Sequence, residues 1–289
     1  MNFEAFISDI AENKWNVHGV EVYEKGILHT YGDTCKGRYP IYSATKTVLS
    51  IAVGIALDQG KIDLGKSILD YIPRENLDAM SDVQRNTFNK LTLHRLMTMS
   101  VDDLPFRPEG ESYLDFSLSC KVNEPETEVF NYSNISAYLV GVALTNAIRE
   151  DAVEFINRNF FEPMKISDAK FSRCPEGYFY GASGMELSVH DLSKVGLLLY
   201  NKGIYEGKRI VSEKYVDMAT SILQMNREGG YGYFIWKYRD GFSINGKWGQ
   251  KCYVLPEREL IITHLADIED DSSNLLHSME KHILGLENR

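Results

Sequence analysis

The chain carries the stretch YPIYSATKTVLSIAVGIALDQGKI at residues 39–62, in which a serine and a lysine precede a long apolar run. Ser43 and Lys46 lie three positions apart, and side chains at this spacing share one face of a helix. Apolar residues cover more than one stripe of the helix expected over 43–59, which is typical of a buried helix. We therefore expect Ser43 Oγ and Lys46 Nζ to meet at the entrance of the protein core.

Burial would make this pair reactive. Loss of water lowers the pKa of a lysine, here from about 10.4 toward about 7. A lysine that is neutral near pH 7 can take the proton of a neighbouring serine hydroxyl. The N–H of Ser43, at the helix start, could also hold a developing oxyanion. A plain alternative stays open, in which Ser43 caps the helix and Lys46 extends its ammonium to water.

The Ser-x-x-Lys pattern occurs three times, so the spacing alone is weak evidence. Ser167 and Lys170 lead into a strand-like stretch, whereas Ser278 and Lys281 belong to an amphipathic surface helix. The helix after Ser43 differs because it is apolar on every side. The sequence therefore favours Ser43 over the other two serines as a nucleophile.

A second polar group precedes the helix predicted in the stretch FNYSNISAYL. A tyrosine hydroxyl near ammonium groups loses its proton more readily, so Tyr132 could relay a proton to a leaving group. Asn134 can offer its amide to a substrate carbonyl. The alternative is structural: a buried aromatic residue before a helix that is capped by Ser133 or Asn134.

A third group lies in the stretch INGKWGQKCYVLP, where Lys247, Trp248 and Gly249 are expected on a strand. Gly249 would let a substrate lie close to the backbone. The N–H of Gln250 could then be the second donor to an oxyanion. The alternative is a hairpin turn followed by a strand.

Strand patterns lie at both ends of the sequence, and helical patterns fill the middle. A hairpin is expected around Lys25-Gly26, and short runs rich in aromatic and branched residues fall between 231 and 266. These patterns predict an α+β fold, with an antiparallel sheet flanked by helices and an all-helical region inserted between its parts. We expect an α/β sheet domain from residues 1–61 and 181–289, a mostly helical domain from residues 62–180, and an active site at their interface.

The charge balance excludes several classes of partner. The 289 residues carry a net charge of −10, and the lysines and arginines are scattered. Nucleic-acid-binding proteins usually show a basic face, so neither a nucleic acid nor an anionic membrane is expected as a partner. The N-terminus lacks a basic start followed by an apolar run, and no apolar run approaches the length of a membrane span. We therefore expect a cytoplasmic location.

Cysteine and histidine spacing gives no sign of a metal or cofactor. Four cysteines lie far apart and are expected as free thiols in a reducing compartment. Seven histidines are scattered, without the spacing typical of metal ligands. His190 and Asp191 are adjacent on a predicted helix, where a surface role is expected, and GASGM lacks the last glycine of a G-x-S-x-G elbow. The sequence predicts no metal, no cofactor and no α/β-hydrolase triad.

The order Ser-x-x-Lys, Tyr-x-Asn, Lys-x-Gly resembles the serine β-lactamase and penicillin-binding-protein superfamily. The match is closest to its class C and esterase-like branch, which includes the 6-aminohexanoate-dimer hydrolases. Flanking segments such as LTLHRLMTMS and GYGYFIWKY are similar as well, so the resemblance covers most of residues 15–285. It implies the β-lactamase/D-peptidase-like fold and an acyl-enzyme mechanism.

The resemblance also implies roles for the residues of the three motifs. Ser43 would be the nucleophile, and Lys46 and Tyr132 would share the general-base and general-acid duty. Which of the two takes the serine proton stays open. Asn134 and Lys247 would orient the substrate and tune Tyr132.

The remaining roles concern the oxyanion and the end of the reaction. The backbone N–H groups of Ser43 and Gln250 would form the oxyanion hole, and water would release the acyl group. Trp248 departs from the family, whose β-lactamases usually carry a Thr or Ser at this position to help bind the antibiotic carboxylate.

These observations favour a cytoplasmic serine hydrolase that cleaves a small ester, amide or short peptide. A β-lactamase or D-alanyl-type peptidase is the first alternative, and a non-catalytic binding or sensor module on the same fold is the second. The expected partner is a small-molecule substrate. The substrate, its acyl group and the oligomeric state stay open.

Overall fold

The computed structural model describes residues 1–123 and 125–286. Its main sheet is antiparallel, with the strand order β2-β1-β10-β9-β8-β7. The N-terminal part supplies two strands and the C-terminal part four: β1 (Val17–Glu24), β2 (Ile27–Gly32), β7 (Trp236–Tyr238), β8 (Gly241–Gly246), β9 (Gln250–Leu255) and β10 (Leu260–Ala266). Both ends of the sequence therefore build one sheet, and the predicted fold class is confirmed.

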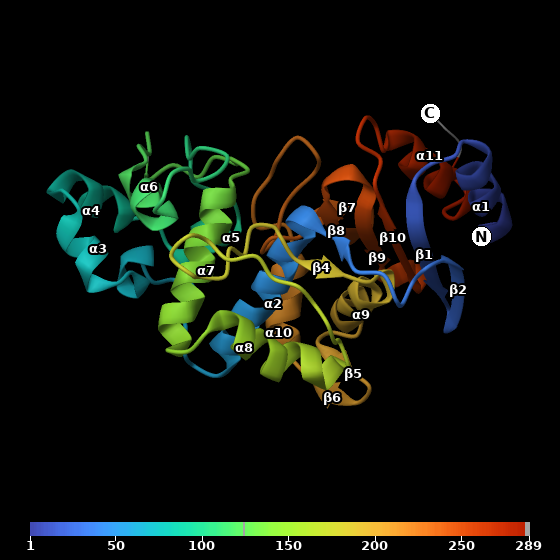
Figure 1. Cartoon of the computed structure of the whole chain (residues 1–289), viewed down its shortest axis with the longest axis horizontal. Coiled ribbons are helices and arrows are strands. Elements are labelled where there is room, and N and C mark those ends of the chain that lie inside the picture. Colours follow the sequence, from blue (N-terminus) through green and yellow to red (C-terminus); the bar gives the residue numbers. More distant parts are fainter. Residues whose placement is uncertain (124, 287–289) are drawn as a thin grey trace.

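Helices cover both faces of this sheet (Figure 1). On one face, α1 (Phe3–Glu12) and α11 (Ser273–His282) pack on a small core that includes Val20 and Val22 of β1. On the other face, α9 (Val189–Tyr200) lies against β1, β9 and β10. Successive residues of a strand point to opposite faces, so Glu21, between the two valines, faces α9.

The remaining helices lie beyond the opposite end of the sheet from β2, with α3, α4 and α6 farthest away (Figure 1). They are α2 (Thr45–Asp58), α3 (Arg74–Ala79), α4 (Asp82–Phe88), α5 (Leu93–Met97), α6 (Tyr113–Ser119), α7 (Asn134–Ile148), α8 (Ala152–Ile156) and α10 (Glu213–Thr220). Two further sheets have two strands each: β3 (Tyr39–Pro40) pairs with β4 (Glu186–Leu187), and β5 (Ile204–Tyr205) pairs with β6 (Lys208–Arg209) in a local hairpin.

A continuous hydrophobic core runs from these helices to the α9 face of the sheet. It includes residues of α2, of α7 and of β9. The predicted division into a domain of residues 1–61 and 181–289 and a domain of residues 62–180 therefore stays a prediction. Among the described residues, no helix combines the length and the apolarity that crossing a membrane would need.

Helix α2 occupies the centre of this core, as its all-round apolar pattern predicts. Its polar side chains have partners: Thr47 Oγ1 donates to Phe234 O at 3.0 Å, and Ser50 Oγ lies 2.9 Å from the Tyr215 hydroxyl. A Cβ at Gly54 would stand 2.4 Å from the Tyr215 ring, so only glycine allows this close packing. The helix is thus fixed on all sides, and so is the position of its first turn.

Candidate active site

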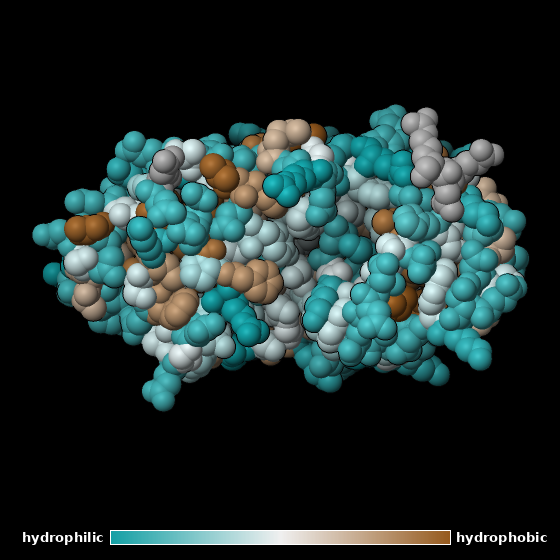
Figure 2. Space-filling model, turned by 90° about the horizontal axis from the view of Figure 1, so that it is seen from above, coloured by the Kyte–Doolittle hydropathy of each residue, from teal (hydrophilic) through white to brown (hydrophobic). Residues whose placement is uncertain are grey.

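Ser43 lies in a 3₁₀ turn, Tyr42–Ala44, that leads directly into α2. Tyr42 has a φ of +46°, in the left-handed region that a bulky residue rarely adopts, and such strain often occurs at functional sites. The end of β8 packs closely on this turn, because a Cβ at Gly246 would stand 2.2 Å from Ile41 O. Ser43 is therefore held between the central helix and the sheet. Seen from above, the molecule is hollowed near its middle (Figure 2).

Lys46 brings its ammonium to Ser43 inside the protein. Lys46 is only 1% exposed, and its Nζ lies 3.2 Å from Ser43 Oγ. Nζ also donates to Asn134 Oδ1 at 2.7 Å and to the carbonyl oxygen of Ala182 at 2.7 Å. The serine and lysine of the first motif therefore meet, as the helical spacing predicted.

Burial lowers the pKa of Lys46 to about 7. A neutral amine has two N–H groups and one lone pair. Asn134 Oδ1 and Ala182 O can only accept, so they would take the two N–H groups. The lone pair would then face the Ser43 hydroxyl, the one partner of the three that can donate. This arrangement can remove the serine proton near neutral pH.

Tyr132 lies on the other side of the same pair. The Lys46 Nζ is 4.9 Å from the centre of its ring. Burial raises the pKa of Tyr132 to about 12, although a hydrogen bond with the Ser43 side chain acts in the opposite direction, and the charge of Glu228 raises it further. The phenol therefore keeps its proton near pH 7 and is suited to donate it.

The first turn of α7 holds Tyr132 and Asn134 in place. Ser133 caps this helix, since its Oγ accepts from Ile135 N at 3.1 Å and donates to Pro105 O at 2.6 Å. The N–H of Asn134 donates to Phe106 O at 2.6 Å. The loop before α6 therefore anchors the second motif through two backbone carbonyl groups, those of Pro105 and Phe106.

The Asn134 amide is already used within the protein. Its oxygen accepts from Lys46, and its side chain also forms a hydrogen bond with the Tyr180 hydroxyl. The sequence predicted that this amide would face a substrate carbonyl. In the structure the amide oxygen orients the lysine, and the contact with a substrate carbonyl stays a prediction for the NH2 group, which has two N–H donors.

The third motif differs from its prediction. Residues Lys247–Gly249 form a 3₁₀ turn between β8 and β9 and do not lie on a strand. Both Trp248, with φ +62°, and Gly249, with φ +93°, have left-handed backbones that end the strand. The N–H of Gln250, predicted as an oxyanion donor, bonds to Lys247 O and is thereby engaged in the turn. The amide of the Gln250 side chain is bonded to Ala266 of β10.

Trp248 is the residue of this turn that reaches the site. Its ring lies 5.1 Å from that of Tyr42, edge to face, and Tyr42 directly precedes Ser43 in the chain. Lys247 is exposed, and its Nζ lies 3.7 Å from the centre of the Trp248 ring. The structure thus brings together Ser43, Lys46, Tyr132 and Asn134, with Trp248 at one rim, while Lys247 points to the surface.

Sequence reasoning missed two partners of the site. The Ala182 carbonyl and the Tyr180 hydroxyl both come from the segment just before β4. The glycines of GASGM were the available signal, since Gly181 has a φ of +67° and packs against Leu49 of α2. A backbone acceptor, however, has no side chain that a sequence motif could reveal.

An aromatic wall extends from Tyr132. Its ring lies 5.5 Å from that of Trp236 and 6.5 Å from that of Phe106, and Phe130 packs edge-on to Trp236 at 5.9 Å. An open cavity of about 700 Å³ adjoins this wall. It is lined by Val129, Phe130, Met225, Asn226, Arg227, Glu228 and Trp236. The cavity offers apolar surface with one guanidinium and one carboxylate.

The chain resembles known proteins over most of its length. The sequence profile of the family described as Beta-lactamase matches residues 16–276. A curated relative, the 6-aminohexanoate-dimer hydrolase of Paenarthrobacter ureafaciens, is 19% identical over 276 residues, which cover 86% of this chain and 70% of the relative.

Solved structures share the architecture. One from Bacillus anthracis, provisionally titled a 6-aminohexanoate-dimer hydrolase, has a TM-score of 0.79 at 19% identity, with 97% of this chain and 83% of that chain covered. The penicillin binding protein from Bacillus halodurans has a TM-score of 0.74 at 15% identity, with 95% and 99% covered. At such identities, the likeness shows that the fold is common to all three.

Proposed function

The chain belongs to the Beta-lactamase family, and on this premise we propose that it is a serine hydrolase that cleaves a small ester, amide or short peptide. The reaction would proceed through an acyl-enzyme on Ser43. One observation carries the proposal: the Nζ of the buried Lys46 lies 3.2 Å from the Ser43 hydroxyl, and this burial lowers the pKa of Lys46 to about 7. If Ser43 only capped the helix, a buried lysine with a lowered pKa would not be needed beside it.

Lys46 is our choice as the base for Ser43. Its pKa of about 7 is far below the value of about 12 for Tyr132, so near pH 7 the lysine can accept a proton and the phenol can donate one. Ser43 Oγ would attack the substrate carbonyl while Lys46 takes its proton. Tyr132 or protonated Lys46 would then protonate the leaving group. We expect kcat/KM to rise as the pH passes about 7, because only neutral Lys46 can act.

The oxyanion needs donors at the same place. The Ser43 N–H, at the beginning of the turn before α2, would be one of them. The Gln250 N–H bonds to Lys247 O, so a second donor would have to come from elsewhere in the turn between β8 and β9. Water would complete the cycle by attacking the acyl group on Ser43.

The cavity beside Tyr132 supports a linear amide or short peptide as substrate. Phe130 and Trp236 offer apolar surface to a flexible chain, and Arg227 and Glu228 can pair with a carboxylate and an ammonium. A molecule that carries both charges fits this lining. The curated relative is named for hydrolysis of the 6-aminohexanoate dimer, which agrees with this class of substrate.

Labelling of the nucleophile tests the proposal. A fluorophosphonate should add one adduct to the native protein, as measured by intact mass, and none to Ser43→Ala. Ser167→Ala is the matched control, because Ser167 belongs to another Ser-x-x-Lys pair and is exposed. Labelling that persists in Ser43→Ala would overturn the assignment of the nucleophile.

A substrate panel then separates the alternatives. Turnover of p-nitrophenyl esters and of short linear amides, without turnover of nitrocefin, would support the proposal. Preferred hydrolysis of nitrocefin or of D-alanyl peptides would favour a β-lactamase or peptidase. Labelling of Ser43 without turnover of any compound would favour a binding or sensor module.

A further inference from the structure

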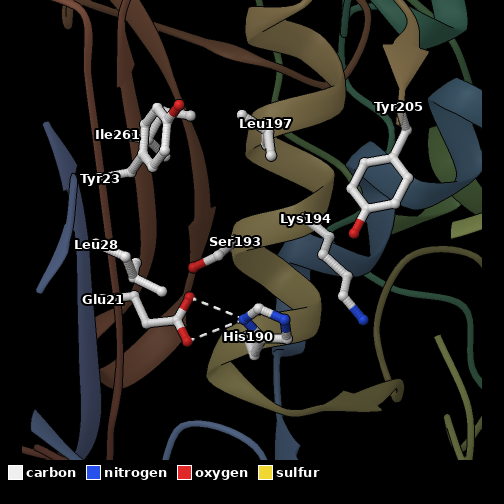
Figure 3. A pocket seen from close by; sticks show the side chains of 9 residues that line it. All are labelled: Glu21, Tyr23, Leu28, His190, Ser193, Lys194, Leu197, Tyr205 and Ile261. Carbon is white, nitrogen blue, oxygen red and sulfur yellow. Dashed lines mark hydrogen bonds and ion pairs between the residues drawn. The ribbon is translucent and has the colours of Figure 1, made fainter. Parts of the chain in front are cut away.

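A second polar cluster, outside the residues that surround Ser43, lies on the α9 face of the sheet. We propose that Glu21, Cys35 and His190 bind a divalent transition metal ion of the zinc type. One donor atom from each residue lies within 4.8 Å of the other two. The cluster adjoins a cavity of about 190 Å³ between β1, β10 and α9 (Figure 3). Catalysis at Ser43 does not depend on this inference.

Glu21 supplies a carboxylate that is unusually placed. It sits within β1, opposite Thr263 of β10, and is only 3% exposed. Its neighbours in the cavity are mostly apolar, and Leu28 and Ile261 are among them. Its two oxygens lie 3.0 and 3.2 Å from His190 Nδ1 (Figure 3). A buried carboxylate requires a cation or strong donors, and a metal ion would satisfy it more fully than one imidazole.

Cys35 is held near this pair by its own loop. The carboxylate of Asp33 accepts from the N–H of Cys35 at 3.2 Å and from the next two N–H groups at 2.9 and 2.8 Å. The N–H of His190 donates to Thr34 O at 2.8 Å, which ties the loop to the first turn of α9. Backbone hydrogen bonds thus hold the Cys35 loop against the first turn of α9. Little conformational entropy would therefore be lost when a metal ion binds.

The donor set matches the preferences of zinc. Thiolate, imidazole and carboxylate are its usual ligands, at about 2.0–2.3 Å, and a site with three protein ligands keeps a fourth position for water. The exposed Cys35 can close the remaining distance with a change of its side chain. Because the ligands come from β1, a loop and α9, no spacing in the sequence could reveal them, and the sequence predicted no metal.

Ser193 gives a second, independent sign of a missing partner. It lies one turn after His190 on α9 and lines the same cavity (Figure 3). Its Oγ is buried and has no hydrogen-bond partner within residues 1–123 and 125–286. A water on the metal could bond to it. The nearby Lys194 is already paired, since its Nζ bonds to Asp191 at 3.3 Å and to Lys165 O at 2.8 Å.

Cobalt titration tests the site directly. Metal-free protein titrated with Co²⁺ should bind one equivalent and show a thiolate-to-cobalt charge-transfer band together with the visible bands of a tetrahedral ion. Cys35→Ser should abolish the charge-transfer band. Loss of an outer partner of a metal ligand already costs about 10–100-fold in affinity, so loss of the thiolate should cost at least about 100-fold. Cys120→Ser, which removes another free thiol, should bind like the native protein.

Zinc and a second substitution complete the test. Zn²⁺ should raise the melting temperature of the native protein and of Cys120→Ser, but not that of Cys35→Ser or His190→Gln. Melting without metal would show that both variants fold. A charge-transfer band that survives in Cys35→Ser, or an equal Zn²⁺ effect on Cys35→Ser and native protein, would overturn the proposal.

Discussion

The start of α2 and the turn between β8 and β9 each carry a lysine of a predicted site motif, but the two lysines have opposite surroundings. At the start of α2, Lys46 is 1% exposed and its Nζ has three fixed partners. In the turn, Lys247 is exposed and lies on the face of an indole ring. Exclusion of water lowers the pKa of Lys46 to about 7, so burial distinguishes this lysine from the exposed Lys247. The sequence motifs of Lys46 and Lys247 do not by themselves reveal this difference in burial.

Removal of the buried lysine should have the largest effect. Lys46→Met keeps the length and apolar volume of the side chain but deletes the base, so kcat/KM should fall by about 10³–10⁴. Fluorophosphonate labelling should slow by a similar factor. An activity within tenfold of the native protein would show that another group takes the serine proton.

The same variant should change the pH dependence of stability. In the unfolded chain the lysine has a pKa near 10.5, and in the folded protein about 7. Between these values the unfolded chain binds the proton and the native protein does not, so a rising pH stabilises the native protein. The free energy of unfolding of the native protein relative to Lys46→Met should rise by about 1.4 kcal/mol per pH unit from 7 to 10. Urea unfolding at several pH values measures it, and a flat difference would contradict the low pKa.

Tyr132→Phe should have the next largest effect. It removes one hydroxyl and leaves the ring beside Lys46, so packing should be conserved. We expect kcat to fall by about 100-fold for poor leaving groups such as amides, which need a proton donor. Activated esters, whose leaving groups depart without protonation, should be affected less. Equal losses for both substrate classes would show that Tyr132 has another role.

Trp248→Ala should reduce activity less than Tyr132→Phe. The substitution removes the edge-to-face contact with Tyr42, a kind of contact worth about 0.5–1.5 kcal/mol beyond its buried area. We expect about a tenfold rise in KM with a smaller change in kcat. Trp15→Ala, which alters a partly buried tryptophan packed against the small core under α1 and α11, should leave KM unchanged. An unchanged KM in Trp248→Ala would show that the turn between β8 and β9 does not contribute to substrate binding.

Lys247→Met should have the smallest effect. Substitutions on the surface usually change free energies by about 0.5 kcal/mol or less, so kcat/KM should change by about twofold at most. The comparison with Lys46→Met is direct, because both variants replace a lysine of a predicted site motif with methionine. A loss for Lys247→Met that approaches the loss for Lys46→Met would show that the exposed lysine closes over the substrate.

Buried helices were the part of the site that the sequence predicted best. The all-round apolar pattern after Ser43 required a central helix, and the spacing of Ser43 and Lys46 followed from helical geometry. Ser133 proved to be the cap of α7, one of two candidates. These predictions succeeded because burial leaves a strong and periodic mark on a sequence.

The sequence did not predict the turn between β8 and β9 or the backbone groups that bind Lys46. The motif at Lys247 was expected on a strand, but Trp248 adopts a left-handed backbone that bulky residues normally avoid, and the strand ends there. The Ala182 carbonyl, which orients Lys46, carries no chemical signature of its own. Such partners follow from the path of the chain in three dimensions.

The pairing of β1 with β10 has a consequence for synthesis of the protein. Val20 lies opposite His264, so the neighbour of the first strand leaves the ribosome about 240 residues later. At about 5–20 residues per second, this delay is roughly 12–50 s. During that time the hairpin of β1 and β2 has an unpaired edge, with Val20 and Val22 uncovered. A nascent chain of this kind is a natural client for a chaperone that binds short hydrophobic segments, and it risks pairing with another unfinished copy on the same polysome.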